Sequence, residues 1–292
     1  MSSIDHRLFL PQMRIGFDDL VARAAAAEEA GFGGVALMDH LAPPLAEDQP
    51  MFEAMTAAMF VAARTDRLGV GHLVLCDAMR HPAVLAKQAV TIDHASGGRF
   101  ELGIGWGSVP SELEVFGVAD TDARSRVRRL AETLDVLKAL WAGEAVDYDG
   151  EFHRIRAGLQ APTPLDRIPI VIGGTGPRTL ALVAEHADWW NLPIHQLGRL
   201  DELRGSIGDA RVSVQVMVAV VPDEASRAEV TATAKRRFGV YEAGLLIGTT
   251  EELAEQFAGL AERGIERVYV WFADFARPET LDQFGREVIT RT

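Results

Sequence analysis

Hydrophobic and polar positions follow two rhythms along the chain. Short, nearly continuous apolar runs alternate with longer segments in which apolar residues recur about every three or four positions. The first pattern is typical of strands in a parallel sheet covered on both faces, and the second of amphipathic helices. Strands are predicted at residues 7–11, 34–38, 68–76, 99–105, 168–172, 187–191, 212–221 and 267–272. Helices are predicted at 18–32, 51–64, 82–96, 126–143, 177–186, 224–238 and 250–264, and a hairpin at 146–155.

Alternation of about eight strands with helices predicts an α/β fold, a single (β/α)8 TIM barrel. A chain of 292 residues is long for one domain but suits such a barrel, and no break in composition marks a second domain within residues 1–292. A doubly wound parallel sheet is the alternative that the pattern leaves open. In a barrel the functional residues lie at the carboxyl ends of the strands, so the segments that follow the strands carry the candidate chemistry.

Composition narrows the classes of function and the cellular setting. The formal net charge of −13 argues against nucleic acid and anionic membranes as partners. Cys76 is the only cysteine, so neither an intramolecular disulfide nor a cysteine zinc site is expected. The first residues lack the features of a signal peptide, and no apolar stretch is long enough to cross a membrane. Together these features predict a cytoplasmic protein.

A glycine-rich turn, IGGTGPRT at 172–179, connects the strand at 168–172 to the helix at 177–186. Glycines let backbone N–H groups approach a ligand closely, and the start of a helix offers unpaired N–H groups to a phosphate. Thr175 would add a hydroxyl and Arg178 a charge. Neither the Walker pattern nor the complete dinucleotide-binding pattern is present. The turn therefore indicates a phosphate site, and a simple tight turn is the alternative.

Two further strand ends offer candidate residues. Gly105 and Gly107 leave room above the barrel mouth, although glycines that serve only close packing would give the same sequence pattern. Asp39 and His40 follow the second strand directly, and imidazole is the usual proton carrier near neutral pH. His81 is the other histidine at a comparable position.

Missing features also limit the chemistry. All three lysines fall within predicted helices, which argues against a Schiff-base enzyme. No His-x-His pair occurs on the first strand and no Gly-x-Ser-x-Gly motif is present, so we expect neither a catalytic metal nor a serine nucleophile. Glycines, aromatic residues and histidine at the barrel mouth suit a planar, phosphate-bearing cofactor that brings its own chemistry.

These segments resemble the luciferase-like monooxygenase superfamily, the flavin- and deazaflavin-dependent barrels related to bacterial luciferase. The resemblance covers most of the chain, through LFLPQ, AEEAGFGGVALMDHL, the segment from Thr65 to Gly107, and IGGTGPRTLALVAEHADWWN. Within the superfamily, MDHL, RHPA and the GGTGPRT turn are most similar to the coenzyme F420 branch, which includes methylenetetrahydromethanopterin reductase. The resemblance implies a barrel with the cofactor in its mouth and a non-proline cis peptide at Leu73–Val74 behind the ring.

Strand-end position and resemblance together give the predicted site. His40 is the predicted catalytic residue, which handles a proton beside the hydride step. The predicted cofactor-binding residues are Asp39, Leu73, Val74, Cys76, Gly105, Trp106, Gly107, Gly173, Gly174, Thr175, Gly176, Pro177 and Arg178.

The chain also departs from the family pattern. Members often have Gly-Ala-Gly-Trp where this chain has Gly105-Trp106-Gly107-Ser108, and of the acidic cluster that usually follows only Glu112 remains. The segment between Asn191 and Arg211 is short, so the site is expected to be open, or closed by another loop such as 42–52. The substrate therefore cannot be inferred from the family.

The resulting prediction is an oxidoreductase that transfers hydride between coenzyme F420 and a small organic substrate. One alternative is a monooxygenase that uses O2 and reduced FMN from a separate flavin or deazaflavin reductase. An alternative of another class is a flavin-binding protein without catalysis. The resemblance implies a homodimer, for which the alanine- and methionine-rich segment at 53–63 is a candidate face, although packing inside the chain explains such a stripe equally.

Overall fold

The computed structural model describes residues 4–44, 46–118, 122–239 and 244–292. Its main sheet is parallel and runs in the order β3-β2-β1-β12-β10-β9-β8-β5-β4. The strands are β1 (Asp5–Phe9), β2 (Gly34–Leu37), β3 (Gly69–His72), β4 (Leu75–Cys76), β5 (Leu102–Gly105), β8 (Ile170–Gly173), β9 (Trp189–Leu192), β10 (Arg211–Val220), β11 (Leu245–Gly248) and β12 (Arg267–Phe272). Because β3 and β4 are consecutive pieces of one predicted strand at opposite ends of this order, the sheet closes into the predicted barrel.

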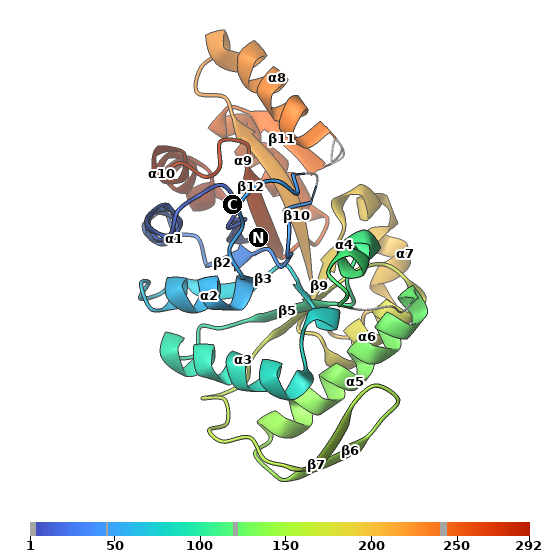
Figure 1. Cartoon of the computed structure of the whole chain (residues 1–292). Helices are drawn as coiled ribbons and strands as arrows, with labels where there is room; N and C mark the ends of the chain where they lie inside the picture. Colours follow the sequence, from blue (N-terminus) through green and yellow to red (C-terminus); the bar gives the residue numbers. More distant parts are fainter. Residues whose placement is uncertain (1–3, 45, 119–121, 240–243) are drawn as a thin grey trace.

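Helices cover the outside of the barrel (Figure 1). They are α1 (Phe17–Glu29), α2 (Ala54–Ala62), α3 (Pro82–Ser96), α4 (Pro110–Val115), α5 (Ala123–Trp141), α6 (Pro177–His186), α7 (Leu200–Arg204), α8 (Arg227–Phe238), α9 (Thr250–Glu262) and α10 (Pro278–Glu287). The two chain ends meet, since the Ile4 N–H donates to the Thr292 carbonyl at 3.0 Å. No helix among the described residues is long and apolar enough to cross a membrane.

The eight predicted strands form the wall of the barrel, and their boundaries are shifted by a few residues. The predicted hairpin is also present, as the antiparallel pair β6 (Val146–Asp149) and β7 (Arg154–Gly158). The sequence patterns did not predict β11, α4, α7 or α10. β11 adds a ninth strand beside the carboxyl half of β10, where β9 has already ended. It is a short apolar run, LLIG, between two predicted helices.

The alanine- and methionine-rich stripe of α2 faces the inside of the chain. Ala57, Ala58 and Val61 are completely buried, and Met55 is nearly so. The stripe therefore serves packing against the barrel, and it gives no support to a dimer interface on this face.

Candidate active site

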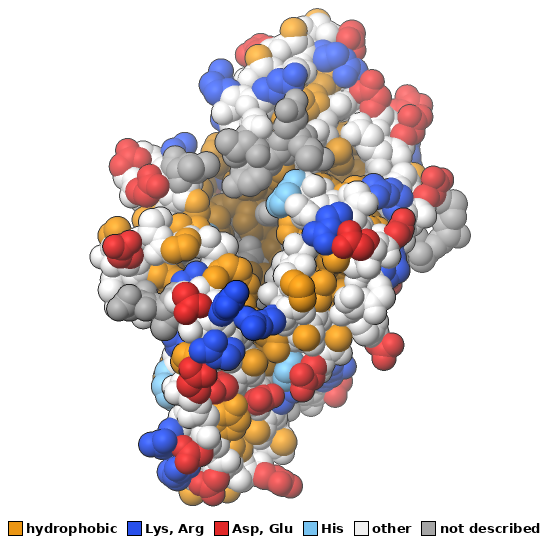
Figure 2. All heavy atoms as spheres, turned by 90° about the vertical axis from the view of Figure 1, so that its right-hand side faces the viewer, with side chains coloured by type: hydrophobic (Ala, Val, Ile, Leu, Met, Phe, Trp, Pro, Cys, Tyr) orange, Lys and Arg blue, Asp and Glu red, His pale blue; other side chains and the backbone are white. Residues whose placement is uncertain are grey.

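A cavity of about 380 Å³ opens at the carboxyl ends of the barrel strands. The face of the molecule in Figure 2 is hollowed at its centre, and hydrophobic side chains gather in the hollow. Ten of the predicted site residues line the cavity. They are Asp39, His40, Leu73, Val74, Cys76, Gly105, Trp106, Gly107, Gly173 and Gly174.

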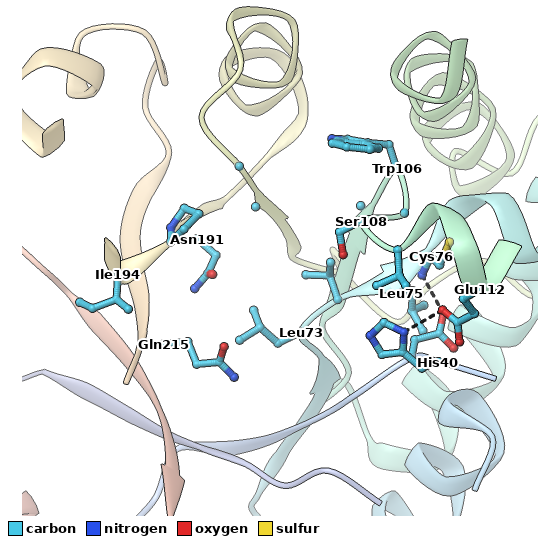
Figure 3. Close-up of a pocket in the computed structure, with 18 of the residues that line it drawn as sticks. His40, Leu73, Leu75, Cys76, Trp106, Ser108, Glu112, Asn191, Ile194 and Gln215 are labelled. Atoms are coloured by element: carbon cyan, nitrogen blue, oxygen red, sulfur yellow. Dashed lines mark hydrogen bonds and ion pairs between the residues drawn. The ribbon is translucent and has the colours of Figure 1, made fainter. Parts of the chain in front are cut away.

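His40 is paired with Glu112 on one wall of this cavity (Figure 3). The imidazole Nδ1 lies 2.8 Å from Glu112 Oε2, and because a carboxylate only accepts, Nδ1 carries the N–H. The other carboxylate oxygen accepts the backbone N–H groups of Leu41 and Ala42. Glu112 lies on the short helix α4, and through these hydrogen bonds it holds the loop that carries His40 in place. This arrangement leaves the Nε2 atom of His40 without a hydrogen-bond partner among the described residues and available for a proton.

Asp39 is occupied by other partners, although it borders the same cavity. Both of its oxygens accept from the Arg80 guanidinium, and Oδ2 also accepts the Cys76 N–H at 2.7 Å. Burial acts to lower the pKa of Arg80, but its hydrogen bonds to Asp39 and Glu53 raise it overall. Asp39 thus ties the ends of β2 and β4 together. Burial raises the pKa of the Cys76 thiol to about 11, so the sulfur is a neutral wall atom.

The back wall of the cavity is formed where the third barrel strand breaks. The Leu73–Val74 peptide is cis, at the position that the resemblance implied, and it separates β3 from β4. Glycine is required opposite this break, because a Cβ at Gly105 would lie 2.9 Å from Val74 Cγ2. The broken strand and the glycine together leave an apolar surface against which a flat ring can lie.

The glycine turn after β8 forms another part of the rim. Gly174 has a φ of +121°, which only glycine adopts readily, and its carbonyl accepts the Trp190 indole N–H at 2.8 Å. No side chain caps α6, so its first N–H groups remain open to a ligand. Thr175, Gly176, Pro177 and Arg178 do not line the cavity; they continue the turn outward, and the last three are exposed. The turn therefore presents unpaired backbone N–H groups just outside the cavity, where an anion could accept them.

A family model described as luciferase-like monooxygenase matches residues 1–237, most of the chain. The chain belongs to the luciferase-like monooxygenase family. This confirms the family prediction, and the barrel described above confirms the predicted fold.

Curated proteins named for coenzyme F420 are among those similar to this chain. An F420-dependent glucose-6-phosphate dehydrogenase of Nakamurella multipartita is 34% identical over 176 residues, which is 60% of this chain and 52% of that protein. The chain spans about half the length of the first curated relatives it matches.

Solved structures show the same fold at low sequence identity. An F420-dependent secondary alcohol dehydrogenase in complex with an F420-acetone adduct has a TM-score of 0.85 at 17% identity, and the match covers 100% of both chains. The EDTA monooxygenase of Chelativorans also has a TM-score of 0.85, at 13% identity, covering 99% of this chain and 94% of that one. Dehydrogenases and monooxygenases thus share this luciferase-like barrel.

Several cavity residues of this family member were not predicted. They are Asn191, Pro193, Ile194, His195, Gln215 and Met217, which lie opposite the His40 wall or follow β9. Gln215 had a usable signal, because it is the one amide in the otherwise apolar run VQVMVAVV. Asn191 is the only asparagine of the chain and ends the predicted strand at 187–191, so it had a usable signal as well.

The remaining candidates lie outside this cavity. His81 is the N-cap of α3, where its Nδ1 accepts the Ala83 N–H at 3.2 Å, and it lines a neighbouring cavity. In the described part of the chain, the one group of three potential metal ligands, Asp135, Glu185 and His186, does not line the site. The predicted closing loop 42–52 contains residue 45, which lies outside the described residues, and the described part of that loop does not line the cavity.

Proposed function

We propose that this protein is an F420-dependent oxidoreductase that transfers hydride between the deazaflavin and a small organic substrate. The observation that carries the proposal is the cavity itself. It brings the His40–Glu112 pair, the apolar wall at the Leu73–Val74 break and the start of the glycine turn to one place. The relatives named for F420 support this cofactor over FMN.

His40 is the proposed proton carrier. With Nδ1 donating to Glu112, the Nε2 atom accepts a proton from a hydroxyl group or returns one to a carbonyl oxygen. Glu112 orients the ring and stabilises the imidazolium that forms, as a carboxylate does in other histidine pairs. The cofactor supplies the hydride chemistry when it is bound. The chain supplies orientation, proton transfer and exclusion of water.

The binding residues divide into two groups under this proposal. Leu73, Val74 and Gly105 face the ring, while Gly174 to Arg178 hold the phosphate through backbone N–H groups and one guanidinium. Asp39 contributes by positioning the His40 loop, since its oxygens are already used by Arg80 and the Cys76 N–H.

The test is cofactor binding followed by turnover. Trp106 lines the cavity, so bound F420 should quench its fluorescence, and Trp106→Phe should remove most of that quenching while binding persists by absorbance. Arg178→Gln should weaken binding roughly tenfold, as expected for one charge-assisted hydrogen bond. If neither F420 nor FMN quenches the fluorescence at micromolar concentration, the proposal fails.

The second candidate is a monooxygenase that uses O2 and reduced FMN from a separate reductase. The fold shared with the EDTA monooxygenase supports this candidate, because the ring and the phosphate of FMN would contact the same residues. Oxygen uptake with reduced FMN, without turnover of F420, would favour it. A cytoplasmic homodimer remains part of both proposals, and sedimentation analysis tests the dimer.

A further inference from the structure

Another small cavity lies at the rim of the barrel, away from the site described above. It has a volume of about 180 Å³ and is lined by Arg14, Ile15, Arg23, Asp274, Phe275 and Arg277. It shares no residue with the cavity that contains His40. Three arginine side chains from three separate segments therefore face one small space.

The charge of this cluster is not neutralised by the described residues. Arg14, Arg23 and Arg277 form no ion pair within 4.0 Å of a described carboxylate, and the buried Nη1 atom of Arg23 has no hydrogen-bond partner. Asp274 is the one acid in the lining, and its two oxygens accept from the Ala276 N–H and from the Thr280 hydroxyl at the start of α10. Arg14 and Arg277 are exposed to solvent, so the evidence for a missing anion comes from the half-buried Arg23, whose buried Nη1 atom has no partner among the described residues.

A fourth arginine adds to the positive charge. The Arg237 guanidinium carbon lies 4.8 Å from the centre of the Phe275 ring, and Arg237 lines an adjoining cavity that also contains Asp274. Burial lowers the pKa of Arg237; Asp274 opposes this effect, and the charges of Arg236, Arg277 and Arg14 lower the pKa further. Clustering of like charges occurs here although the whole chain has a net charge of −13.

The backbone around the cavity is unusual as well. Four non-glycine residues of the described chain have positive φ, and three of them line this cavity or directly follow its lining residues: Arg14 (59°), Phe275 (64°) and Ala276 (58°). Such conformations are unfavourable for residues with a side chain, and they concentrate at functional sites. The strained turns bring Arg14 and Arg277 to the same cavity.

The position of the cluster separates it from the glycine turn. Arg14 follows β1 and Arg277 follows β12, and these two strands are neighbours in the barrel. The glycine turn follows β8, which is four strands from β1 in the closed sheet and therefore on the opposite side of the mouth. A phosphate held by the glycine turn and an anion held by the arginines occupy different sites.

We propose that Arg14, Arg23, Arg237 and Arg277 form a second anion site, which binds the phosphate group of a small phosphorylated molecule. Guanidinium groups match the oxygens of a phosphate with paired, charge-assisted hydrogen bonds, and several of them in one cavity favour a multiply charged group over a single carboxylate. The site exists whether or not a redox cofactor is bound in the other cavity.

Inorganic phosphate is the probe that tests this site, measured by calorimetry and by the rise in melting temperature at constant ionic strength. Arg277→Gln and Arg23→Gln should each weaken phosphate binding about tenfold or more, and Arg277→Lys should weaken it less. Arg178→Gln at the glycine turn should leave this binding unchanged. Arg154→Gln removes an exposed charge from the hairpin and serves as the control for net charge.

The outcomes separate the possibilities. Absence of phosphate binding, or binding that only Arg178→Gln weakens, would overturn the proposal. Circular dichroism shows whether each variant is folded, and two independent variants protect the test if one is not. Persistence of phosphate binding after saturation with F420 would support a site separate from that of the cofactor, whereas loss of binding would overturn the proposal of two separate sites.

Discussion

The two ends of the barrel use paired charges in opposite ways. At the amino end, the Arg267 guanidinium donates to Asp5 Oδ2 at 2.7 Å and to Glu101, and the Tyr269 hydroxyl donates to the second Glu101 oxygen at 3.1 Å. Arg267 also lies 3.7 Å from the centre of the Trp189 ring. At the carboxyl end, Glu112 holds His40 through one nitrogen and leaves the other facing the cavity.

The two ends differ in how fully their charged groups are paired. Burial lowers the pKa of Arg267, but the charges of Glu101, Tyr269 and Asp5 outweigh this effect and hold its pKa above the usual range. Arg267 therefore stays charged near neutral pH, and its partners Asp5 and Glu101 hold it in the wall of the barrel. The His40 pair, by contrast, keeps one nitrogen unsatisfied, which is what proton transfer requires.

The largest effect expected is on activity at the carboxyl end. His40→Ala should lower kcat by about 10²- to 10⁴-fold, because it removes the proton carrier, while the affinity for F420 changes little. Steady-state kinetics and fluorescence titration on the same sample measure the two quantities. Preserved turnover would remove His40 from the mechanism, and lost binding would instead make it part of the cofactor site.

Glu112→Gln is the matched variant for this pair. The amide keeps the shape of the side chain but cannot stabilise an imidazolium, so kcat should fall, although less than in His40→Ala, while the affinity for F420 changes little. A purely structural role of Glu112 would lower the melting temperature and leave kcat unchanged.

The next largest effect is on stability at the amino end. Arg267→Met leaves Glu101 buried without its cation, whereas the partly buried Asp5 keeps Arg7, and the change should lower the free energy of unfolding by about 3–5 kcal/mol. Urea unfolding measures it. Arg211 lies 4.0 Å from the same Trp189 ring but is exposed and paired with Glu266, so Arg211→Met should cost less than about 1 kcal/mol. Equal losses in the two variants would show that burial of the Arg267 network adds nothing to its stabilising effect.

Sequence reasoning succeeded where the signal was contiguous. The eight barrel strands could be predicted because each is one apolar run, and the glycine turn because its residues lie side by side in the chain. The position of His40 followed from its place directly after β2, and that of the Leu73–Val74 break from family resemblance alone.

The same reasoning missed features that only the fold assembles. The arginines of the second cavity come from residues 14, 23, 237 and 277, and no local pattern links them. Glu112 reaches His40 from a helix of six residues, too short for periodicity to reveal. Closure of the barrel, rather than any motif, brings these residues together.

The smallest effect expected concerns an acid at the carboxyl end that is buried without full pairing. Asp77 follows Cys76, its Oδ1 atom has no hydrogen-bond partner, and Oδ2 lies 3.6 Å from Arg129 Nε. Burial raises the pKa of this carboxyl to about 6, against the opposing effects of a Thr133 hydrogen bond and Arg129. The folded state therefore binds the proton more tightly than the unfolded state, and stability should fall as the pH rises from about 4 to about 6.

Asp77→Asn removes this ionisation while keeping the size of the side chain. Its free energy of unfolding should exceed that of the wild type by about 1–3 kcal/mol at pH 7–8, and the two proteins should converge near pH 4, where the native carboxyl is protonated. Urea unfolding across this pH range measures the difference, and the acidic end of the series serves as the internal control. A variant that is less stable than the wild type at pH 8 would show that Asp77 is satisfied by Arg129. The carboxyl end would then pair its acids as completely as the amino end does, and only His40 would distinguish the two.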